Sequence, residues 1–276
     1  MTGGKTRIDR VAILGGGNLG GAIARGFAAS GFVEAGNVAV TRRRVEFLED
    51  LAAEGFRTLS DNREAIDGAD VVILCVQPQQ MEDLLEGVAP TLDTRKQVVI
   101  STATGVAIAD IRRWVGSEIP VLRAMPNLGI AIGESMTCLA ADEASTEAVP
   151  VARTVFDVMG STLLIREDQM TSATALCACG IAFFLRAIRA ASQGGIEIGF
   201  HAEEALQLAS QTAKGAAALL LSNRNHPEME IDKVTTPQGC TISGLNEMEN
   251  RGFSSAMVRG IIRSADKAGG LYQSGE

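Results

Sequence analysis

The residues best suited to chemistry near the start of the chain form a glycine-rich run directly after an apolar segment. Val11–Leu14 is entirely apolar, and the run GGGNLG follows it at positions 15–20. This is the G-x-G-x-x-G pattern between a buried strand and a helix start, which brings backbone N–H groups close to phosphates. The first glycine allows the turn, the second leaves room for a pyrophosphate, and the third lets the helix lie close to the strand. We predict a dinucleotide site at Gly15, Gly17, Asn18, Leu19 and Gly20; the alternative is a purely structural turn.

A basic cluster after the second predicted strand indicates which dinucleotide is bound. Sites for NAD place an Asp or Glu about 20 residues after the glycines, where it holds the ribose 2′-OH. This chain has Thr41 followed by three arginines, with no carboxylate before Glu46. Guanidinium groups pair with phosphate through two hydrogen bonds, which suits a 2′-phosphate. We assign Thr41, Arg42 and Arg43 to that end and predict NADP(H) as the preferred cofactor, with NAD(H) possible. A solvated arginine turn is the alternative.

Three further segments stand where later strands end and near the C-terminus. They read VQPQ at 76–79, RAMPN at 123–127 and DKVTTPQGCTI at 232–242, the last followed by Gly252-Phe253. In this order and spacing they resemble the pyrroline-5-carboxylate reductase family along essentially the whole chain. The Met-Pro-Asn and V-T-x-P-x-G-x-T-I segments are the most specific of these. The glycine run alone would not separate this family from other dehydrogenases.

The resemblance implies a fold, an activity and a cofactor position. The fold is an N-terminal Rossmann-type domain followed by a helical domain that interlocks with its twin, and in some members such dimers form larger rings. The activity is the NADPH-dependent reduction of the cyclic imine 1-pyrroline-5-carboxylate to L-proline, the last step of proline synthesis. Asn62 would touch the adenosine end of the cofactor. The nicotinamide would lie near Val76, Gln77, Pro78, Ala103, Met125, Pro126 and Asn127.

The resemblance also implies where the substrate binds, which is the turn at 239–242 at the dimer interface. The substrate carboxylate would lie on backbone N–H groups of this turn, and the Thr241 hydroxyl would reach the ring nitrogen. A cyclic imine takes up its proton readily, so positioning can supply much of the rate. Thr241 is the predicted catalytic residue, as a donor and orienter; a helix cap is its alternative role. The predicted substrate-binding residues are Gly239, Cys240, Thr241, Ile242 and Cys179.

Departures from the family pattern cluster where substrate and nicotinamide are expected. The run CACGIA at 177–182 stands in place of Ser-Gly-Ser-Gly-Pro-Ala. Gln77 replaces a Lys, Leu128-Gly129 replaces Thr-Pro, and Gln238 and Cys240 change the C-terminal motif. These changes suit a divergent member. A reductase of a different cyclic imine and a catalytically weak, NADPH-binding paralogue with a sensing role are therefore alternatives.

Other residue types could carry chemistry, and for each a structural role is the better interpretation. A 3-hydroxy acid enzyme of this fold needs a helical Lys followed by Asn, and the residues around Lys214 lack that Asn. Three cysteines, Cys177, Cys179 and Cys240, could bind zinc or act in redox chemistry, but small apolar filling is favoured and no metal is predicted. Cys75 is expected in the core of the third strand.

The elements that must position these residues follow two different patterns. Short apolar runs alternate with amphipathic stretches in the first part, which is typical of strand–helix units around a mostly parallel sheet. The predicted strands are 11–14, 38–41, 71–76, 98–102, 121–124, 136–140 and 162–165, and the helices between them are 18–29, 45–54, 81–87, 108–115 and 144–159. After Arg166 come only helical stretches, at about 168–178, 180–198, 202–222, 238–249 and 254–269.

These patterns predict an α/β class with two domains. Residues 1–166 form the NADP(H)-binding Rossmann-type domain, and residues 167–276 form an all-α dimerisation and substrate domain. The helical part is rich in small residues, as in ALQLASQTAKGAAALLL at 205–221, so we expect it to pack against a second copy. A monomeric helical cap is the alternative.

Composition limits the kinds of partner and the compartment. Hydrophobic residues make up 46% and charged residues 21% of the 276 residues, as in globular proteins. The net charge of -8 argues against nucleic acid and anionic membrane as partners. The polar start MTGGKTRIDR is unlike a signal peptide, no apolar run is expected to span a membrane, and five cysteines give no disulfide framework. We expect a cytoplasmic homodimer that binds small molecules.

Overall fold

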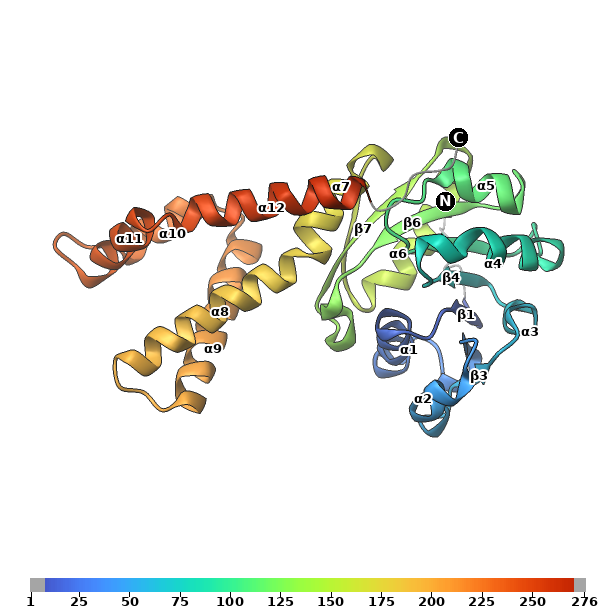
Figure 1. Cartoon of the computed structure of the whole chain (residues 1–276), viewed down its shortest axis with the longest axis horizontal. Helices are drawn as coiled ribbons and strands as arrows, with labels where there is room; N and C mark the ends of the chain where they lie inside the picture. Colours follow the sequence, from blue (N-terminus) through green and yellow to red (C-terminus); the bar gives the residue numbers. More distant parts are fainter. Residues whose placement is uncertain (1–7, 271–276) are drawn as a thin grey trace. The chain divides into compact units, whose positions relative to one another are not determined.

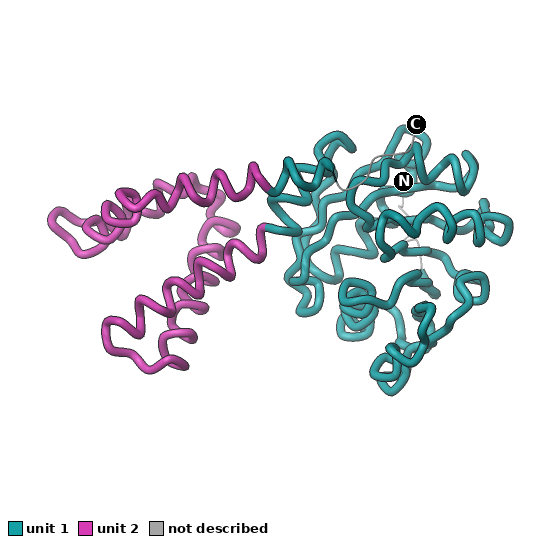
Figure 2. The backbone as a smooth tube through the Cα atoms, in the orientation of Figure 1, with its two compact units in different colours: residues 1–179, 264–276 teal, residues 180–263 magenta. Residues whose placement is uncertain are grey.

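The structure, a computed structural model, describes residues 8–270, and the chain divides into two compact units. Unit 1 comprises residues 1–179 and 264–276, and unit 2 comprises residues 180–263 (Figure 2). The polar start of the sequence falls mainly on residues 1–7, outside the described residues.

The described part of unit 1 is built on an eight-stranded sheet in the order β3-β2-β1-β4-β5-β6-β7-β8 (Figure 1). The strands are β1 (Val11–Leu14), β2 (Val38–Thr41), β3 (Arg57–Leu59), β4 (Val71–Leu74), β5 (Val98–Ser101), β6 (Val121–Met125), β7 (Ser135–Ala141) and β8 (Gly160–Leu164). The strands from β3 to β6 are parallel, β7 is antiparallel to β6, and β8 is parallel to β7. The strand order reverses between β1 and β4, which is where such sheets bind ligands.

Helices cover both faces of this sheet because its strands are apolar on both sides. The α-helices of the Rossmann part are α1 (Asn18–Ser30), α2 (Glu49–Ala53), α3 (Asn62–Ile66), α4 (Met81–Val88), α5 (Ile108–Val115) and α6 (Val149–Asp157). Short 3-10 helices are η1 (Ala35–Asn37), η2 (Val45–Leu48), η3 (Pro78–Gln80), η4 (Ala89–Thr91), η5 (Leu128–Ile132) and η6 (Glu143–Ala148). One core cluster joins Ile13 with Phe27 and Phe156, and the other joins Leu14 with Leu85 and Ile111. The predicted α/β class is confirmed.

Two predicted helices of unit 1, 45–54 and 144–159, differ from the structure, and two observed elements were not predicted. Residues 45–54 form η2 followed by the short helix α2. The stretch 144–159 is not one helix, because residues 143–148 form η6 and α6 begins only at Val149. Pro150 lies in the first turn of α6, where a missing N–H costs no helical hydrogen bond. The short strand β3 and helix α3 were not predicted, so the predicted third strand is β4.

The segment that follows β8 contains three kinds of helix in succession. It comprises the 3-10 helix η7 (Glu167–Gln169), the α-helix α7 (Met170–Ala173) and the π-helical turn η8 (Thr174–Ala178). A single α-helix over 168–178 was predicted. The turn is π-helical because the Cys179 N–H donates to the Thr174 carbonyl five residues earlier, at 2.9 Å.

The regular elements of unit 2 are all helices, joined by short loops. Its helices are α8 (Gly180–Glu197), α9 (Ala202–Asn223), α10 (Pro227–Val234), α11 (Cys240–Asn250) and α12 (Phe253–Gly269), the last of which continues into unit 1. Gly195 packs against Ala205 where α8 and α9 pair, so small residues bring these helices close. The helix α10 was not predicted; it begins with Pro227 after His226, whose Nδ1 accepts the Glu228 N–H at 3.3 Å.

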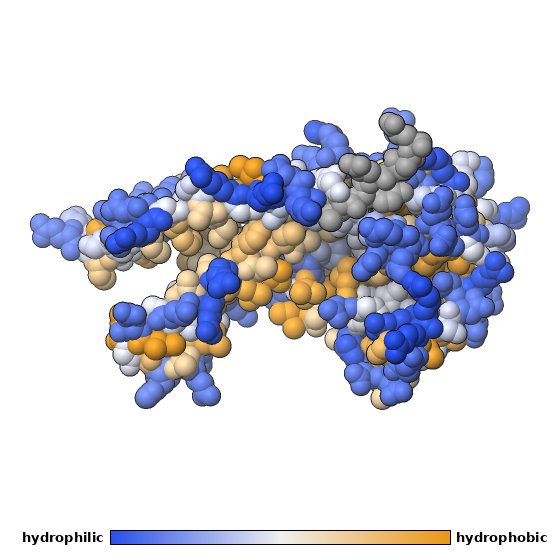
Figure 3. All heavy atoms as spheres, viewed as in Figure 1, coloured by the Kyte–Doolittle hydropathy of each residue, from blue (hydrophilic) through white to orange (hydrophobic). Residues whose placement is uncertain are grey.

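One helical stretch, Glu167–Glu197, is long and apolar enough to cross a membrane by length and composition. The expectation that no such run exists is wrong by this criterion, because residues between Asp168 and Arg186 carry no charge. One such stretch is weak evidence for a membrane span, since core helices of soluble proteins meet the same criterion. Figure 3 shows apolar residues, in orange, along the helical unit, where an interface helix would expose them.

Candidate active site

The glycine turn after β1 is held in place by the end of β2. The N–H groups of Gly15 and Gly16 both donate to the Thr41 carbonyl, at 3.2 and 2.7 Å. Gly15 has a φ of +114°, a conformation that favours glycine, and a Cβ at Gly20 would overlap the Gly15 carbonyl oxygen. Gly17 is exposed and caps α1 without a side-chain hydrogen bond, and a Cβ at this residue would meet no atom within 4 Å. The start of α1 therefore presents free N–H groups beside open space, which suits a phosphate.

The basic cluster after β2 is organised around an aromatic ring that was not predicted. The guanidinium of Arg42 lies 4.6 Å from the centre of the Phe47 ring, and that of Arg44 lies 4.3 Å from it. Arg42 also donates to the Gly16 carbonyl at 3.4 Å, which ties the cluster to the glycine turn. Arg43 makes no hydrogen bond or ion pair within the described chain, so its guanidinium is available to a ligand.

Thr41 and Glu46 lie at the two ends of this cluster in the sequence. Thr41 is 2% exposed, and its carbonyl rather than its hydroxyl takes part in the turn. Arg44 donates to Glu46 at 2.9 Å, and this hydrogen bond lowers the pKa of the Glu46 carboxyl. Glu46 is therefore paired with Arg44 and not free to hold a ribose hydroxyl.

A cleft of about 440 Å³ opens at the carboxyl ends of β1, β4 and β5, where the strand order reverses. Its volume is within the range of small-molecule and cofactor sites. It brings together five residues that were predicted to bind the cofactor from separate parts of the sequence. The residues that line it are Leu19, Cys75, Val76, Gln77, Pro78, Gln79, Thr102, Ala103 and Thr104.

Cys75 lines this cleft and does not lie in a strand, which corrects its predicted place, but it still packs, partly buried, against the core. It follows β4 and is half-buried, and the Thr102 hydroxyl lies 3.5 Å from its sulfur. Burial raises the pKa of the Cys75 thiol to about 12, against the opposing effect of the Thr102 hydrogen bond. The thiol therefore stays protonated at neutral pH and is a poor nucleophile.

A second hollow, of about 370 Å³, contains Asn62. Asn62 is the first residue of α3, and the preceding Asp61 caps that helix by accepting the Arg63 N–H at 2.8 Å. The hollow lies between α3 and α4, so Asn62 is separate from the residues of the larger cleft. This arrangement leaves Asn62 at a surface where one end of an extended cofactor could bind.

The Met125-Pro126-Asn127 segment ends β6 next to β7. Met125 is 4% exposed and packs in a small cluster with Cys138 and Met170, so its side chain belongs to the core. The Asn127 side chain accepts the Gly129 N–H at 2.9 Å, and the Asn127 N–H donates to Ser135 at 3.2 Å. None of the three residues lines the 440 Å³ cleft as the structure describes it.

In unit 2, the turn at 239–242 forms the start of α11. Gly239 is the N-cap, and a Cβ there would overlap the side-chain and carbonyl oxygens of Thr236. No side chain caps this helix, so its first N–H groups are free to hold an anion. Thr241 is the second helical residue, and its half-exposed hydroxyl has no partner within the described residues. The alternative role of Thr241 as a helix cap is therefore wrong.

The three cysteines considered for zinc or redox chemistry differ in their exposure and in their partners. Cys240 is exposed at the start of α11, whereas Cys179 is half-buried at the end of the π-helical turn. Cys177 lies beside Cys138 instead, with 3.6 Å between the two sulfur atoms. Within residues 8–270, no group of three or more His, Cys, Asp or Glu side chains comes together in a way that could hold a metal ion.

Sequence reasoning missed several residues of the site. Phe47 gave no signal, because a single exposed aromatic residue in a helical pattern has no motif around it. Gln79, Thr102 and Thr104 could have been found from their positions at or shortly after the ends of the predicted strands 71–76 and 98–102, since the carboxyl ends of parallel strands meet at one edge of the sheet. The pairing of Cys138 with Cys177 had no sequence signal.

The fold and the cleft together define a class of protein: an NAD(P)H-dependent oxidoreductase with a Rossmann-type domain. A family model described as NADP oxidoreductase, coenzyme F420-dependent, matches residues 10–105. A second model, described as pyrroline-5-carboxylate reductase dimerisation, matches residues 167–271.

Known proteins identify the family within this class. Pyrroline-5-carboxylate reductase 2 of Dictyostelium discoideum is 46% identical over 94% of this chain and 91% of its own length. Pyrroline-5-carboxylate reductase 1 of the same organism is 50% identical over 95% of this chain, and this chain spans 50% of that relative. A solved pyrroline-5-carboxylate reductase from Coxiella burnetii has a TM-score of 0.86 at 27% identity and covers 97% of this chain and 100% of its own. The chain belongs to the pyrroline-5-carboxylate reductase family.

Proposed function

We propose that this protein reduces 1-pyrroline-5-carboxylate to L-proline with NADPH, as a homodimer in the cytoplasm. The observation that carries the proposal is the 46% identity to a named pyrroline-5-carboxylate reductase over 91% of that relative's length. Three features of the structure support it. The cleft at the strand reversal would take the nicotinamide, the basic cluster would take the 2′-phosphate, and the free start of α11 would take the substrate carboxylate.

The cofactor would be held along unit 1 by groups that are already in position. The N–H groups at the start of α1 and the open space at Gly17 would take the pyrophosphate. Arg42 and Arg43 would pair with the 2′-phosphate, and Val76, Pro78 and Ala103 would surround the nicotinamide end. When bound, NADPH supplies the hydride that the imine carbon accepts.

The protein would contribute position and hydrogen bonds to this reaction. The first N–H groups of α11 would hold the substrate carboxylate, since no side chain competes for them. The Thr241 hydroxyl, which has no partner in the described chain, would donate to the ring nitrogen and orient it. Cys179 and Ile242 stay predicted substrate-binding residues. No strongly acidic group is required because the imine nitrogen takes up a proton readily.

A different cyclic imine is a second candidate substrate, and one observation favours it. The run 177–181 carries two cysteines and an isoleucine, and Cys179 is a predicted substrate-binding residue directly after the π-helical turn. These side chains are less polar than the serines of the family pattern, so they would suit a larger or less polar ring. The third candidate is a paralogue that binds NADPH and acts as a sensor.

One assay separates these candidates. We would follow the oxidation of NADPH and of NADH by the purified protein with pyrroline-5-carboxylate, and with piperideine-carboxylate in parallel. Turnover of the pyrroline with NADPH supports the proposal. Turnover of the six-membered ring alone supports the second candidate. Tight NADPH binding without turnover of either imine supports the sensor and would sink the proposed activity.

The proposal also covers the compartment and the oligomeric state of the protein. All five cysteines are free in the structure, as expected for a reducing compartment such as the cytoplasm. The match to a dimerisation model over 167–271 supports self-association, and a homodimer is the simplest symmetric form.

A further inference from the structure

Two cysteines that lie far apart in the sequence meet inside unit 1. Cys138 is on β7 and Cys177 is in the π-helical turn η8, and their sulfur atoms are 3.6 Å apart. A disulfide bond is about 2.05 Å long, so the two sulfurs need to approach by only about 1.5 Å. Both residues belong to the same compact unit, so the contact does not depend on how the units are arranged.

The two sides of this contact differ in how freely they can move. Cys138 is fixed in the sheet, because β7 pairs with β6 on one side and with β8 on the other. Cys177 lies in a π-helical turn between two α-helices, and such turns are less favourable than α-helix and often occur at functional sites. A shift toward α-helical winding at 174–178 would move Cys177 relative to the sheet. The turn can therefore supply the approach that the bond needs.

The two thiols also differ in reactivity. Cys177 is half-buried, and its hydrogen-bonding contact with Cys138 lowers the pKa of the Cys177 thiol. Cys138 is 4% exposed, and that hydrogen bond and burial raise its pKa. Cys177 is the more exposed of the two and its lowered pKa favours the reactive thiolate, so Cys177 is the attacking residue and Cys138 is the one that completes the bond.

We propose that Cys138 and Cys177 form a redox-sensitive thiol pair, which small-molecule disulfides such as oxidised glutathione convert to an intramolecular disulfide. The Cys177 thiolate attacks one sulfur of the small disulfide, whose S–S bond breaks and releases one thiolate. Cys138 then loses its proton to solvent and attacks the Cys177 sulfur, which expels the second thiolate. The protein loses two electrons and two thiol protons, and the small disulfide is reduced to two thiols.

The other three cysteines lack these properties. Cys75 has a thiol whose pKa is raised to about 12 and whose sulfur lies next to Thr102. Cys179 has no sulfur partner among the described residues, and Cys240 is exposed in unit 2. The pair is therefore specific to β7 and the π-helical turn.

The bond would act on the residues next to it. Cys138 is the direct strand partner of Met125, which precedes Pro126-Asn127, and Cys177 is two residues before Cys179. Drawing the turn toward β7 would shift Cys179, which we predict to contact the substrate. This consequence rests on the proposed function: we expect the oxidised protein to reduce its imine several-fold more slowly and to recover with dithiothreitol.

The test uses the full-length protein in a series of glutathione redox buffers. After acid quenching, free thiols are alkylated and the peptides are mapped by mass spectrometry. We expect a peptide pair joined through Cys138 and Cys177, lighter by two hydrogen atoms than the two reduced peptides. Cys240→Ser should leave this bond intact, and Cys177→Ser should abolish it. The peptide map of the wild-type protein shows whether Cys138 and Cys177 form the disulfide, even if a variant at the buried Cys138 fails to fold.

Several outcomes would overturn the inference. These are a glutathione adduct that persists on Cys177, a bond through any other cysteine, a bond between two chains, and no oxidation at all. A bond that forms without slowing turnover would overturn its effect on catalysis. If the reduced protein fails to turn over the pyrroline, the proposed function fails, while the peptide map still decides the thiol pair.

Discussion

At the residue scale, the basic cluster after β2 is arranged before any ligand binds. Phe47 is 52% exposed, and two guanidinium groups stack on its ring at 4.6 and 4.3 Å. Each such contact contributes about 0.5–1 kcal/mol at an exposed site, which is enough to restrict long side chains. Restricting Arg42 in advance reduces the conformational entropy lost when it pairs with a phosphate.

The double variant Arg42→Ala/Arg43→Ala tests whether this cluster reads the 2′-phosphate. Charge-assisted hydrogen bonds contribute about 1.5–3 kcal/mol, so the preference for NADPH over NADH should fall by about 10- to 100-fold. Steady-state kinetics with both cofactors give the ratio, and NADH kinetics should change little. An unchanged ratio would remove these arginines from the phosphate site.

Thr241→Ala tests the catalytic residue itself. Because the hydroxyl has no partner in the described chain, its removal leaves no polar group unsatisfied within the protein. We expect kcat/KM for the imine to fall about 10- to 100-fold, the effect of one lost hydrogen bond in the transition state, with NADPH affinity nearly unchanged. Thr241→Ser keeps the hydroxyl and should retain most activity. An equal loss of cofactor affinity would mean that Thr241 is structural.

At the scale of elements, the β1–α1 turn contains two glycines with different roles. A Cβ at Gly20 would overlap the Gly15 carbonyl, whereas a Cβ at Gly17 would meet nothing within 4 Å. Gly20→Ala should therefore lower the melting temperature, because α1 must move away from β1. Gly17→Ala should fold normally but bind NADPH at least about tenfold more weakly, since the methyl group takes space beside the phosphate site. Thermal melting and cofactor titration of both variants separate the effects, and equal behaviour would contradict this division.

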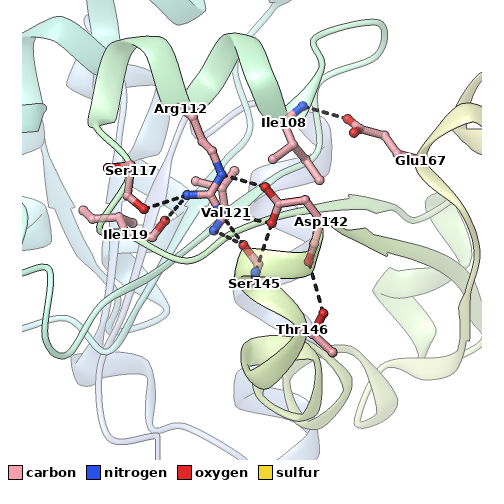
Figure 4. A network of polar contacts seen from close by, with 9 residues as sticks. All are labelled: Ile108, Arg112, Ser117, Ile119, Val121, Asp142, Ser145, Thr146 and Glu167. Atoms are coloured by element: carbon pink, nitrogen blue, oxygen red, sulfur yellow. Dashed lines mark hydrogen bonds and ion pairs between the residues drawn. The ribbon is translucent and has the colours of Figure 1, made fainter.

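A polar network joins α5, β6 and η6 (Figure 4). Arg112 donates to Asp142 at 2.7 and 3.0 Å and to the Ser145 hydroxyl at 2.7 Å. The Arg112 hydrogen bond lowers the pKa of Asp142 below its ordinary value of 3.8. The Arg112 side chain is only 16% exposed, so the pair is shielded from solvent more than a surface pair is.

Asp142→Asn should destabilise the fold by about 1–3 kcal/mol at neutral pH, because Arg112 would lose its charged partner. Since folding lowers the pKa of Asp142, this stabilisation is present above 3.8 and is lost as the pH falls through the folded-state value. The difference between wild type and variant should close on acidification, which unfolding curves at several pH values would show. Asp168→Asn removes an exposed pair with Arg166 and should change little. A difference that is independent of pH would contradict the assignment.

The sequence predicted those elements whose local signals agree with their packing. The bounds of β1, β2 and α5 were predicted as observed, because apolar runs and helical spacing coincide there with burial on the sheet. β3 was missed because its three residues are only half-buried and show no alternation. The π-helical turn was missed because its i→i+5 bond depends on packing against β7, which no local pattern encodes.

The residues of the candidate site also fall into two groups, those that the sequence predicts and those that it does not. The glycine run and the arginines could be predicted because phosphate recognition uses a local motif. The cleft required the strand order, which brings Leu19, Pro78 and Ala103 together from three separate turns. Phe47 and the Cys138–Cys177 contact could not be predicted, since each depends on side-chain positions that only the folded chain determines.

At the scale of the whole molecule, unit 2 exposes many large apolar side chains, and extended apolar surface of this kind marks interaction sites. Large apolar side chains are exposed on each of its helices. They include Phe184, Leu185, Ile196, Leu206, Leu208, Leu219, Leu221, Met229, Val234, Met248, Phe253, Val258 and Ile262. Burying one such side chain stabilises by about 1.5–3 kcal/mol, so several of them can hold two chains together. This surface, together with the dimerisation model over 167–271, accounts for self-association.

Phe184→Glu tests this surface. Phe184 is 62% exposed in the single chain, so a charge there does not disturb the fold of one copy, but in an interface it would have to be buried without a partner. We expect the dimer dissociation constant to rise at least about 100-fold, seen as a smaller species by sedimentation velocity. Ile132→Glu changes a residue of unit 1 that is 78% exposed and should leave the assembly intact. The dissociated variant should still bind NADPH, because the cofactor residues lie in unit 1 of one chain, and should lose imine turnover, because the substrate is expected at the interface. A variant that stays dimeric would remove α8 from the interface, and a monomer with full turnover would place the substrate within a single chain.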